Sequence, residues 1–361
     1  MHRIGSLALA LVLTACSAHA TAVAEPSAAG QWGNVRVEPG QKQSGFLPVA
    51  AGPDGATQLP MTIVRGAKPG PVVAVLAGVH GSEYVPILAS QRLREQLDPK
   101  ELSGTVVLVH SSNPPAFFQR TVYYSPVDWK NLNRVFPGKA NGTLTERVAH
   151  VLTRDVIERA DAMLDLHAGD ANEALTPYVA YIADSPDPRL VARARDMALA
   201  FGIDVVKART PGVLDPAHTK YTSDTAAARG KPAIGVELGQ LAQAPEAEVA
   251  RVADGVMRVL RHLHVLPGEA RPVEHPRWLV RTESITATAE GILTTSLQPG
   301  QRVEAGERVG TIRDFFGQVL AEARAPIAGT VVYVTKTPPI RAGESIASIG
   351  QFDDAPPHAN P

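Results

Sequence analysis

Residues 71–83, Pro71-Val-Val-Ala-Val-Leu-Ala-Gly-Val-His-Gly-Ser-Glu83, contain the pattern that decides the fold. The first eight residues form a continuous apolar run, which is typical of a strand buried on both faces of a parallel sheet. The run ends at a glycine and leads into His80 and Glu83. In open α/β sheets, ligands bind at the carboxyl ends of such strands, where loops converge. This stretch therefore predicts an α/β fold with polar residues at a strand end.

Strand and helix patterns alternate along the chain as far as residue 268. The strand patterns lie at 61–65, 106–110, 162–167, 177–183 and 233–238. The helical patterns lie at 85–97, 144–159, 188–201 and 246–264. Such alternation predicts a sheet with helices on both faces, and we assign residues 59–268 to one catalytic domain.

The pattern changes after Pro267 to short β stretches with frequent glycine and proline. Residues 303–312 (VEAGERVGTI) and 340–349 (IRAGESIASI) are two copies of one β-turn-β unit. We therefore expect a small all-β barrel or sandwich over 269–352, followed by a disordered tail over 353–361. Its turns resemble the biotinyl/lipoyl hammerhead, but the hairpin Arg313-Asp-Phe-Phe-Gly317 offers no lysine to modify. A structural cap that shapes the pocket entrance is the favoured interpretation.

The composition favours a folded protein and argues against a nucleic-acid binder. The chain has 361 residues, 44% of them hydrophobic, which is enough for two domains. Its 35 Lys and Arg balance its 36 Asp and Glu, whereas a nucleic-acid binder normally has a basic excess. Beyond the first 25 or so residues, no stretch approaches the roughly 18 consecutive apolar residues of a membrane span.

The first 24 residues predict an export signal, because a basic start precedes an apolar core at 4–15 that is too short to span a bilayer. Two processing schemes remain open. Leu13-Thr-Ala-Cys16 resembles a bacterial lipobox, in which Cys16 would be lipidated. Ala18-His-Ala20 or Ala22-Val-Ala24 would suit an ordinary signal peptidase instead.

We expect an exported, periplasmic protein that contacts a membrane only through a lipid on Cys16. Cys16 is the only cysteine, so the mature protein would have no disulfide and no sulfur ligand. Residues 25–58 are rich in Ala, Gly, Pro and Gln, and we interpret them as a linker that leads into an edge strand near 35–37.

Three strand patterns end in residues that can bind a metal or move protons: His80 with Glu83, His167, and Glu237. An unpaired charge buried at such a position would be costly, so core filler is an unfavourable explanation. Two imidazoles, one carboxylate and an open position form the arrangement of catalytic zinc. We therefore predict one zinc ion per chain, held by His80, Glu83 and His167. For His167 the structural alternative is a core histidine bonded to Asp165, which would otherwise orient it as a ligand.

With these residues in view, the chain resembles the succinylglutamate desuccinylase/aspartoacylase family, a branch of the zinc carboxypeptidase superfamily. The matching segments are Gly78-Val-His-Gly-Ser-Glu83, Asn113-Pro-Pro-Ala-Phe117, Asn131-Leu-Asn-Arg-Val-Phe-Pro-Gly138, Asp165-Leu-His-Ala-Gly169 and Gly235-Val-Glu-Leu-Gly239. The similarity spans about residues 60–350. It implies an α/β fold, a zinc-carboxypeptidase-like mixed sheet flanked by helices, with a C-terminal all-β barrel-sandwich domain.

The resemblance also implies roles for residues of the site. Glu237 would be the general base, Asn133 and Arg134 would bind the substrate carboxylate, and Arg120 would polarise the scissile carbonyl. The chemistry of the residue types agrees, since a carboxylate can accept the proton of water and an arginine can bind a carboxylate through two hydrogen bonds. The structural alternatives are a loop-capping pair for Asn133 and Arg134 and a buried structural carboxylate for Glu237. Tyr123, Tyr124 and Tyr221 are further candidates to line the pocket.

The sequence therefore predicts a zinc-dependent amidohydrolase that deacylates an N-acyl amino acid or a similar small carboxylate-bearing amide. An exported metallocarboxypeptidase would use the same chemistry. The β-rich C-terminal domain and the short Asn-Leu-Asn-Arg pattern favour the deacylase. A non-catalytic periplasmic binding protein is disfavoured because every expected ligand and Glu237 are retained.

Overall fold

The computed structural model describes residues 30–211 and 214–356. The predicted export signal with its lipobox and the end of the predicted tail lie outside these residues. No helix in the described part is long and apolar enough to cross a membrane.

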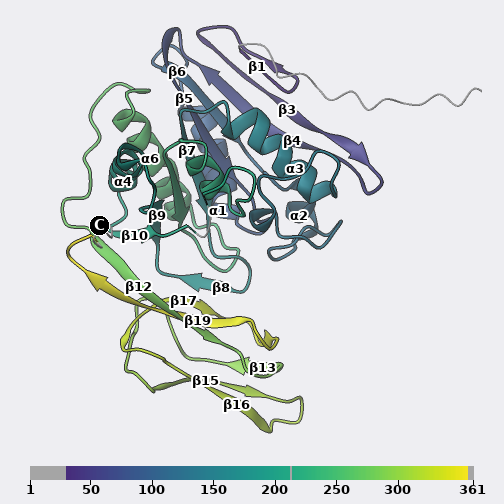
Figure 1. Ribbon diagram of the computed structural model, residues 1–361, viewed down its shortest axis with the longest axis vertical. Coiled ribbons are helices and arrows are strands. Elements are labelled where there is room, and N and C mark those ends of the chain that lie inside the picture. The colour runs from purple at the N-terminus through teal and green to yellow at the C-terminus, as the bar shows by residue number, and fades with distance from the viewer. Residues whose placement is uncertain (1–29, 212–213, 357–361) are drawn as a thin grey trace, which may run out of the picture.

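A large mixed sheet runs through the molecule (Figure 1). In spatial order its strands are β14 (Arg302–Val303), β17 (Gly329–Thr335), β19 (Ser345–Asp353), β12 (Arg277–Thr286), β10 (Val205–Arg209), β9 (Tyr178–Ile182), β11 (Ala233–Glu237), β7 (Ala162–His167), β5 (Lys68–Ala77), β6 (Ser103–Val109), β4 (Gly55–Arg65) and β3 (Gln41–Gly52). β11, β7, β5 and β6 are parallel to one another. Their carboxyl ends therefore lie at one edge of the sheet, as the sequence predicted.

Helices cover both faces of this sheet. On one face, α1 (Tyr84–Gln96) and α4 (Pro188–Phe201) both contact α6 (Glu246–His262). On the other face lie α3 (Leu144–Leu152), the π-helical turn η2 (Thr153–Ile157) and α5 (Thr222–Ala227). The predicted helix at 144–159 is therefore divided into an α-helix and a π-helical turn. The short α2 (Pro114–Gln119) and η1 (Leu132–Arg134) follow β6.

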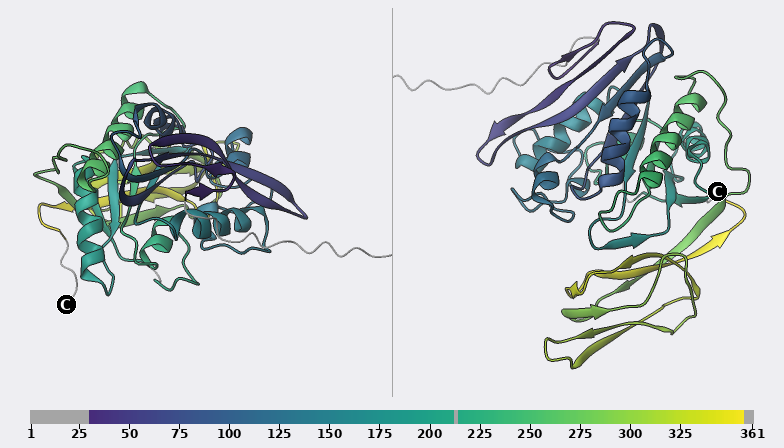
Figure 2. Two further views of the ribbon diagram at one scale, coloured as in Figure 1. Left: turned by 90° about the horizontal axis from the view of Figure 1, so that it is seen from above. Right: turned by 180° about the vertical axis from the view of Figure 1, so that it is seen from behind.

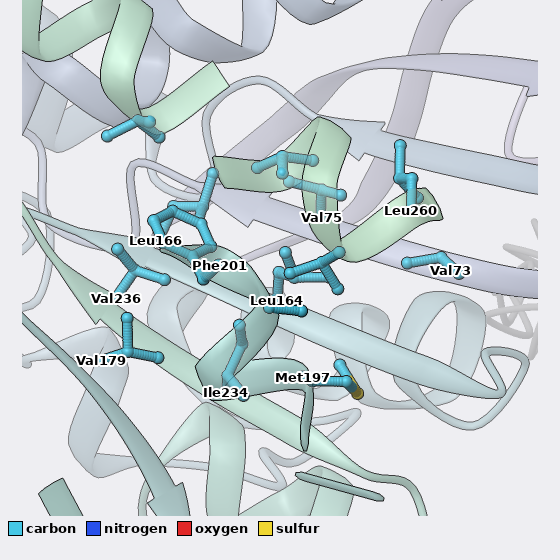
Figure 3. Packing of buried hydrophobic residues seen from close by; sticks show 14 of the residues in the cluster. Val73, Val75, Leu164, Leu166, Val179, Met197, Phe201, Ile234, Val236 and Leu260 are labelled. Atoms are coloured by element: carbon cyan, nitrogen blue, oxygen red, sulfur yellow. The ribbon is translucent and has the colours of Figure 1, made fainter. Parts of the chain in front are cut away.

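The central strands are buried on both faces because they serve two cores. Leu164 of β7 packs on the side of α4 and α6, whereas its neighbour Met163 packs on the side of α3. Figure 3 shows Leu164 and Val75 gathered with Phe201 of α4. Gly255 of α6 allows this approach, since a Cβ there would lie 2.5 Å from the Phe201 ring. Burial on both faces explains why the sequence of such strands is a continuous apolar run.

The prediction of a linker over 25–58 is wrong for residues 41–58. β3 and β4 form a long antiparallel hairpin with β3 at the edge of the sheet, and it projects from the molecule in Figure 2. β1 (Gln31–Trp32) and β2 (Val35–Arg36) pair only with each other. The strand pattern is weak because β3 fully buries only Leu47 and Val49.

The C-terminal residues form a sandwich, in agreement with the predicted fold. β12, β17 and β19 face a second sheet made of β13 (Gly291–Thr294), β15 (Arg308–Arg313), β16 (Val319–Arg324) and β18 (Pro339–Ile340), with a shared hydrophobic core. The two sequence repeats build the same turn, with Gly306 at φ 80° and Gly343 at φ 90°. β12 pairs in parallel with β10, so this β-rich lobe continues the main sheet. β8 (Glu173–Leu175) pairs with β17 of the lobe.

Candidate functional site

His80, Glu83 and His167 converge from two strand ends. His80 and Glu83 lie in the turn between β5 and α1, and His167 is the last residue of β7. His80 Nδ1 lies 2.7 Å from Glu83 Oε1, and His167 Nδ1 lies 3.0 Å from Glu83 Oε2. One potential ligand atom from each residue lies within 4.8 Å of the other two. The structure thus brings together the three residues that the sequence predicted as metal ligands.

A glycine in this turn allows α2 to pack against it. A Cβ on Gly81 would lie 2.2 Å from the carbonyl carbon of Ala116 in α2, which no side chain can tolerate. The segment that follows α2 carries Asn131, which contacts His80. The glycine between the two predicted ligands therefore helps to position a neighbour of the site.

On each imidazole, an oxygen atom contacts the nitrogen that points away from Glu83 and orients the ring. His80 Nε2 lies 3.1 Å from Asn131 Oδ1, and His167 Nε2 lies 3.1 Å from Asp165 Oδ2. Asn131 Oδ1 also accepts the Asn133 backbone N–H at 2.8 Å, which fixes the oxygen on this side of the amide. Because each oxygen accepts a proton from Nε2, the Nδ1 lone pair of each ring faces Glu83.

This donor set fits a metal ion. Two lone pairs and a carboxylate at these distances repel one another unless a cation lies between them. Two neutral imidazoles and one carboxylate, with a far-side acceptor on each ring, are typical ligands of catalytic zinc. Burial alone would disfavour the charge on Glu83, which is 3% exposed.

When no metal is bound, protons occupy the space between the two imidazoles and the Glu83 carboxylate. Burial opposes a charged imidazole, but the Glu83 carboxylate outweighs it and raises the pKa of His80 to about 9. Burial likewise opposes the charge on His167, and Asp165 with Glu83 raises its pKa well above the ordinary value. Burial would raise the pKa of Glu83, but the two histidines lower it to about 2. A metal ion must therefore displace protons to bind here.

Glu237 lies beside the cluster. It ends β11 and pairs in register with His167 of β7. Burial raises the pKa of Glu237 to about 8, while the charge of His167 acts in the opposite direction. A carboxylate whose pKa lies near neutrality is suited to accept and return a proton.

Asn133 and Arg134 line the same cavity as these residues. Asn133 Oδ1 accepts hydrogen bonds from the backbone and the hydroxyl of Thr222, both at 2.9 Å. Its Nδ2 lies 3.4 Å from His167 Nε2. The Asp165 carboxylate lies closer to the same nitrogen, at 3.1 Å, and therefore decides which ring nitrogen carries the proton. Arg134 donates to the Asn133 carbonyl at 2.8 Å and lies 4.8 Å from the centre of the Tyr221 ring. Its remaining N–H groups are available to a carboxylate.

Arg120 does not lie in this site, and its predicted role is not supported. It is the exposed residue that ends α2, with a left-handed φ of 55°. Its side chain borders a separate hollow with Leu88 and Phe118. Distance along the sequence could not reveal that Arg120 borders this separate hollow.

The cluster opens into a cavity of about 500 Å³. The residues that line it and that the sequence left unassigned include Glu173, Lys207 and Arg209, with Tyr333 from the β-rich lobe. Lys207 and Arg209 lie two residues apart on β10, so their side chains lie on the same face of the strand. Two cations at this spacing were the sequence signal that could have identified them. A second hollow of about 580 Å³ lies near Met61 and Phe117, but it contains none of the predicted site residues.

Tyr123, Tyr178 and Tyr221 line the cavity, whereas Tyr124 is 46% exposed. The Tyr123 ring lies edge-on to His80, with 6.1 Å between the ring centres. Its hydroxyl lies 2.6 Å from Glu173 Oε1. Because β8 carries Glu173 and pairs with the β-rich lobe, that lobe is part of the cavity wall near His80.

Comparison with known proteins agrees with this geometry. The family model of the succinylglutamate desuccinylase/aspartoacylase catalytic domain matches residues 69–263. The chain belongs to the succinylglutamate desuccinylase/aspartoacylase family.

Relatives share most of the length of this chain. The N-alpha-acetyl-L-2,4-diaminobutyric acid deacetylase of Halomonas elongata is 29% identical over 323 residues, which cover 86% of this chain and 91% of that protein. The product-bound ectoine utilization protein EutE (DoeB) of Ruegeria pomeroyi is 25% identical, with a TM-score of 0.77 over 88% of this chain and 97% of that one. A succinylglutamate desuccinylase/aspartoacylase of Rhodobacter sphaeroides is 26% identical, with a TM-score of 0.74 over 87% and 96%. The family supports hydrolase activity of the deacylase type for this chain.

Proposed function

We propose that this protein is a zinc-dependent deacylase that cleaves the amide bond of an N-acyl amino acid or a similar small carboxylate-bearing amide. The observation that carries the proposal is the buried His80–Glu83–His167 cluster, with Glu237 on the adjacent strand and Arg134 in the same cavity. The Halomonas elongata relative, named as a deacetylase of an N-acetylated diamino acid, supports the same reaction type.

His80, Glu83 and His167 would hold the zinc ion. When bound, zinc supplies Lewis-acid activation of water and of the scissile carbonyl. Arg134 binds the substrate carboxylate through its planar guanidinium and thereby fixes the position of the amide. Glu237 accepts a proton from the attacking water and returns it to the amide nitrogen as the C–N bond breaks. The products are a carboxylic acid and a free amine.

The proposal predicts the outcome of one substrate panel. Purified protein loaded with zinc is assayed against N-acetyl and N-succinyl amino acids and against short peptides, with and without a chelator. We expect chelator-sensitive hydrolysis of N-acyl amino acids. Preferential release of C-terminal residues from peptides would favour the metallocarboxypeptidase instead. Binding of these compounds without any hydrolysis would indicate a non-catalytic protein.

We also propose that the protein is exported to the periplasm and is tethered there by a lipid on Cys16. The support is the basic start, the short apolar core and the lipobox-like Leu13-Thr-Ala-Cys16. Cys16→Ser should then release the protein from the membrane fraction into the periplasm. A wild-type mature chain that begins at Thr21 or Glu25 would show ordinary signal cleavage without a lipid.

A further inference from the structure

A buried turn after β7 contacts the turn that carries His80 and Glu83. Asp170 lies three residues after His167, in the connection between β7 and β8. Ser82 lies between the two ligands of the first turn, and its Oγ donates a hydrogen bond to Asp170 Oδ1. Ser82 is 1% exposed and Asp170 is 0% exposed, so this bond lies in the protein interior, where a hydrogen bond is stronger than in water. The bond joins the two turns from which all three predicted metal ligands extend.

The turn that carries Asp170 is fixed to the loop after β11. The Gly169 N–H donates to the Gly239 carbonyl at 2.9 Å, and the Leu241 N–H donates to the Glu173 carbonyl at 2.8 Å. A Cβ on Gly169 would lie 2.5 Å from the Glu173 carbonyl oxygen, so the turn is too tight for a side chain at this residue. Backbone hydrogen bonds and close packing therefore give Asp170 a firm support.

The same turn contacts the surroundings of His80 at a second point. The Tyr123 hydroxyl lies 2.6 Å from Glu173 Oε1 and 2.9 Å from Asn172 Oδ1. The ring of Tyr123 lies edge-on to the His80 imidazole. The turn after β7 thus supports the first ligand through an aromatic ring as well as through the backbone beside it.

Asp170 makes its bond to Ser82 at a cost. Its Oδ2 is buried and has no hydrogen-bond partner among the residues that the structure describes. An asparagine could accept from the same hydroxyl without burying a charge. What the carboxylate adds is strength, because a hydrogen bond to an ionised acceptor is roughly twice as strong as one between neutral groups. A strong attachment of Ser82 is therefore the property that this aspartate supplies.

We propose that Asp170 is a positioning residue of the metal site. Through Ser82, it holds the turn of His80 and Glu83 next to the end of β7. The inference rests on the proposed function, in which these two residues and His167 hold zinc. Neither Ser82 nor Asp170 is among the residues that line the cavity, so both act through the ligands. Without their bond, the first turn must be ordered when zinc binds, and the affinity for zinc falls.

The test measures the zinc dissociation constant of the full chain by competition with a chromophoric chelator. Ser82→Ala and Asp170→Ala should each weaken zinc binding by about ten- to a hundredfold, the usual effect of removing a partner that supports metal ligands. Because both changes remove the same bond, the double variant should lose no more than the larger single loss. Losses that multiply in the double variant would contradict a shared bond. Asp170→Asn should retain part of the affinity, since its amide oxygen can still accept from Ser82.

A matched control removes another buried hydroxyl. Ser90 lies on α1, is 0% exposed and donates to the Ile87 carbonyl at 2.7 Å. Ser90→Ala should lower the free energy of unfolding of the metal-free protein and leave the zinc dissociation constant unchanged. An equal loss of zinc affinity in Ser90→Ala and Ser82→Ala would overturn the inference, because a general loss of stability would then explain both.

A spectroscopic measurement reports the position of the ligands. Cobalt(II) bound in place of zinc has visible absorption bands that depend on the geometry of its ligands. Ser82→Ala and Asp170→Ala should shift these bands, whereas Ser90→Ala should not. Urea unfolding of each metal-free protein establishes that it is folded, and Ser82→Ala with Asp170→Asn provides the test if Asp170→Ala does not fold. A wild-type spectrum and wild-type zinc affinity in folded Ser82→Ala would overturn the inference.

Failure of this inference and failure of the proposed function give different results. If the wild type hydrolyses N-acyl amino acids with zinc and the variants at Ser82 and Asp170 keep full zinc affinity, only the positioning role fails. If the wild type binds zinc but hydrolyses none of these compounds, the proposed function fails and the zinc affinities still decide on Asp170. A wild type that binds no zinc would overturn both.

Discussion

Replacement of Asp165 tests how the metal ligands are oriented. The carboxylate is 2% exposed, and its Oδ2 lies 3.1 Å from His167 Nε2. It keeps the proton on Nε2, so that the Nδ1 lone pair faces Glu83. In Asp165→Asn, the amide can turn either its oxygen or its NH₂ group towards the ring. The second orientation stabilises the tautomer that cannot bind metal through Nδ1.

Loss of such a far-side partner typically weakens metal binding by about 10- to 100-fold, or roughly 1.4 to 2.7 kcal/mol. We expect Asp165→Asn near the lower value. Asp165→Ala should lie near the upper value, because Asn133 offers only a donor to the same nitrogen. Competition with a chromophoric chelator measures the zinc dissociation constant, with Asp254→Asn on the exposed face of α6 as the control. An Asp165→Ala protein that binds zinc as tightly as the wild type would refute this account of ligand orientation.

Three further predictions concern the base, the carboxylate and a buried histidine. Glu237→Gln should keep the fold and the zinc but lose about 10²–10⁴ in kcat, and near-normal turnover with zinc bound would mean that another residue activates the water. Arg134→Ala should lower kcat/KM for an N-acyl amino acid by about ten- to two-hundredfold. The same variant should cause little further loss for the substrate whose α-carboxylate is replaced by an amide. Equal reaction of acid and amide in the wild type would exclude recognition of the carboxylate by Arg134. His110 lies between the hydroxyls of Thr62 and Ser90, at 2.8 and 2.9 Å, and burial lowers its pKa to about 4. Since the unfolded state takes up the proton first, stability should be complete above pH 6.5 and fall by on the order of 3 kcal/mol as the pH drops from about 6.5 to about 4. Urea unfolding at pH 7 and pH 4.5 should show a smaller difference in His110→Gln, and an unchanged difference would remove His110 as the cause.

The central part of the site could be predicted from the sequence because its residues stand at strand ends. His80, His167 and Glu237 each follow or end a buried apolar run, and a parallel sheet brings the carboxyl ends of such runs to one edge. Local pattern and one rule of sheet topology were therefore sufficient for the α/β class and for the proximity of these three residues.

Residues whose position depends on long-range pairing could not be predicted in this way. Lys207 reaches the cavity because β10 lies between β9 and β12, and Glu173 does so because β8 pairs with a strand about 160 residues later. The hairpin of β3 and β4 was missed because an edge strand buries few residues and its pattern is weak. Arg120 was misplaced because the direction of the turn after α2 is decided by packing.

Zinc titration of the metal-free protein tests the central claim most directly. The protein is stripped with a chelator, zinc is added in known steps, and both bound metal and hydrolysis of an N-acetyl amino acid are followed. We expect activity to rise linearly and to stop rising at about one equivalent of zinc per chain. We expect His80→Ala and His167→Ala neither to bind zinc tightly nor to recover activity. Full activity in the metal-free protein would contradict a zinc-dependent reaction. One tightly bound zinc per chain in the His80→Ala/His167→Ala double variant would contradict this assignment of the ligands.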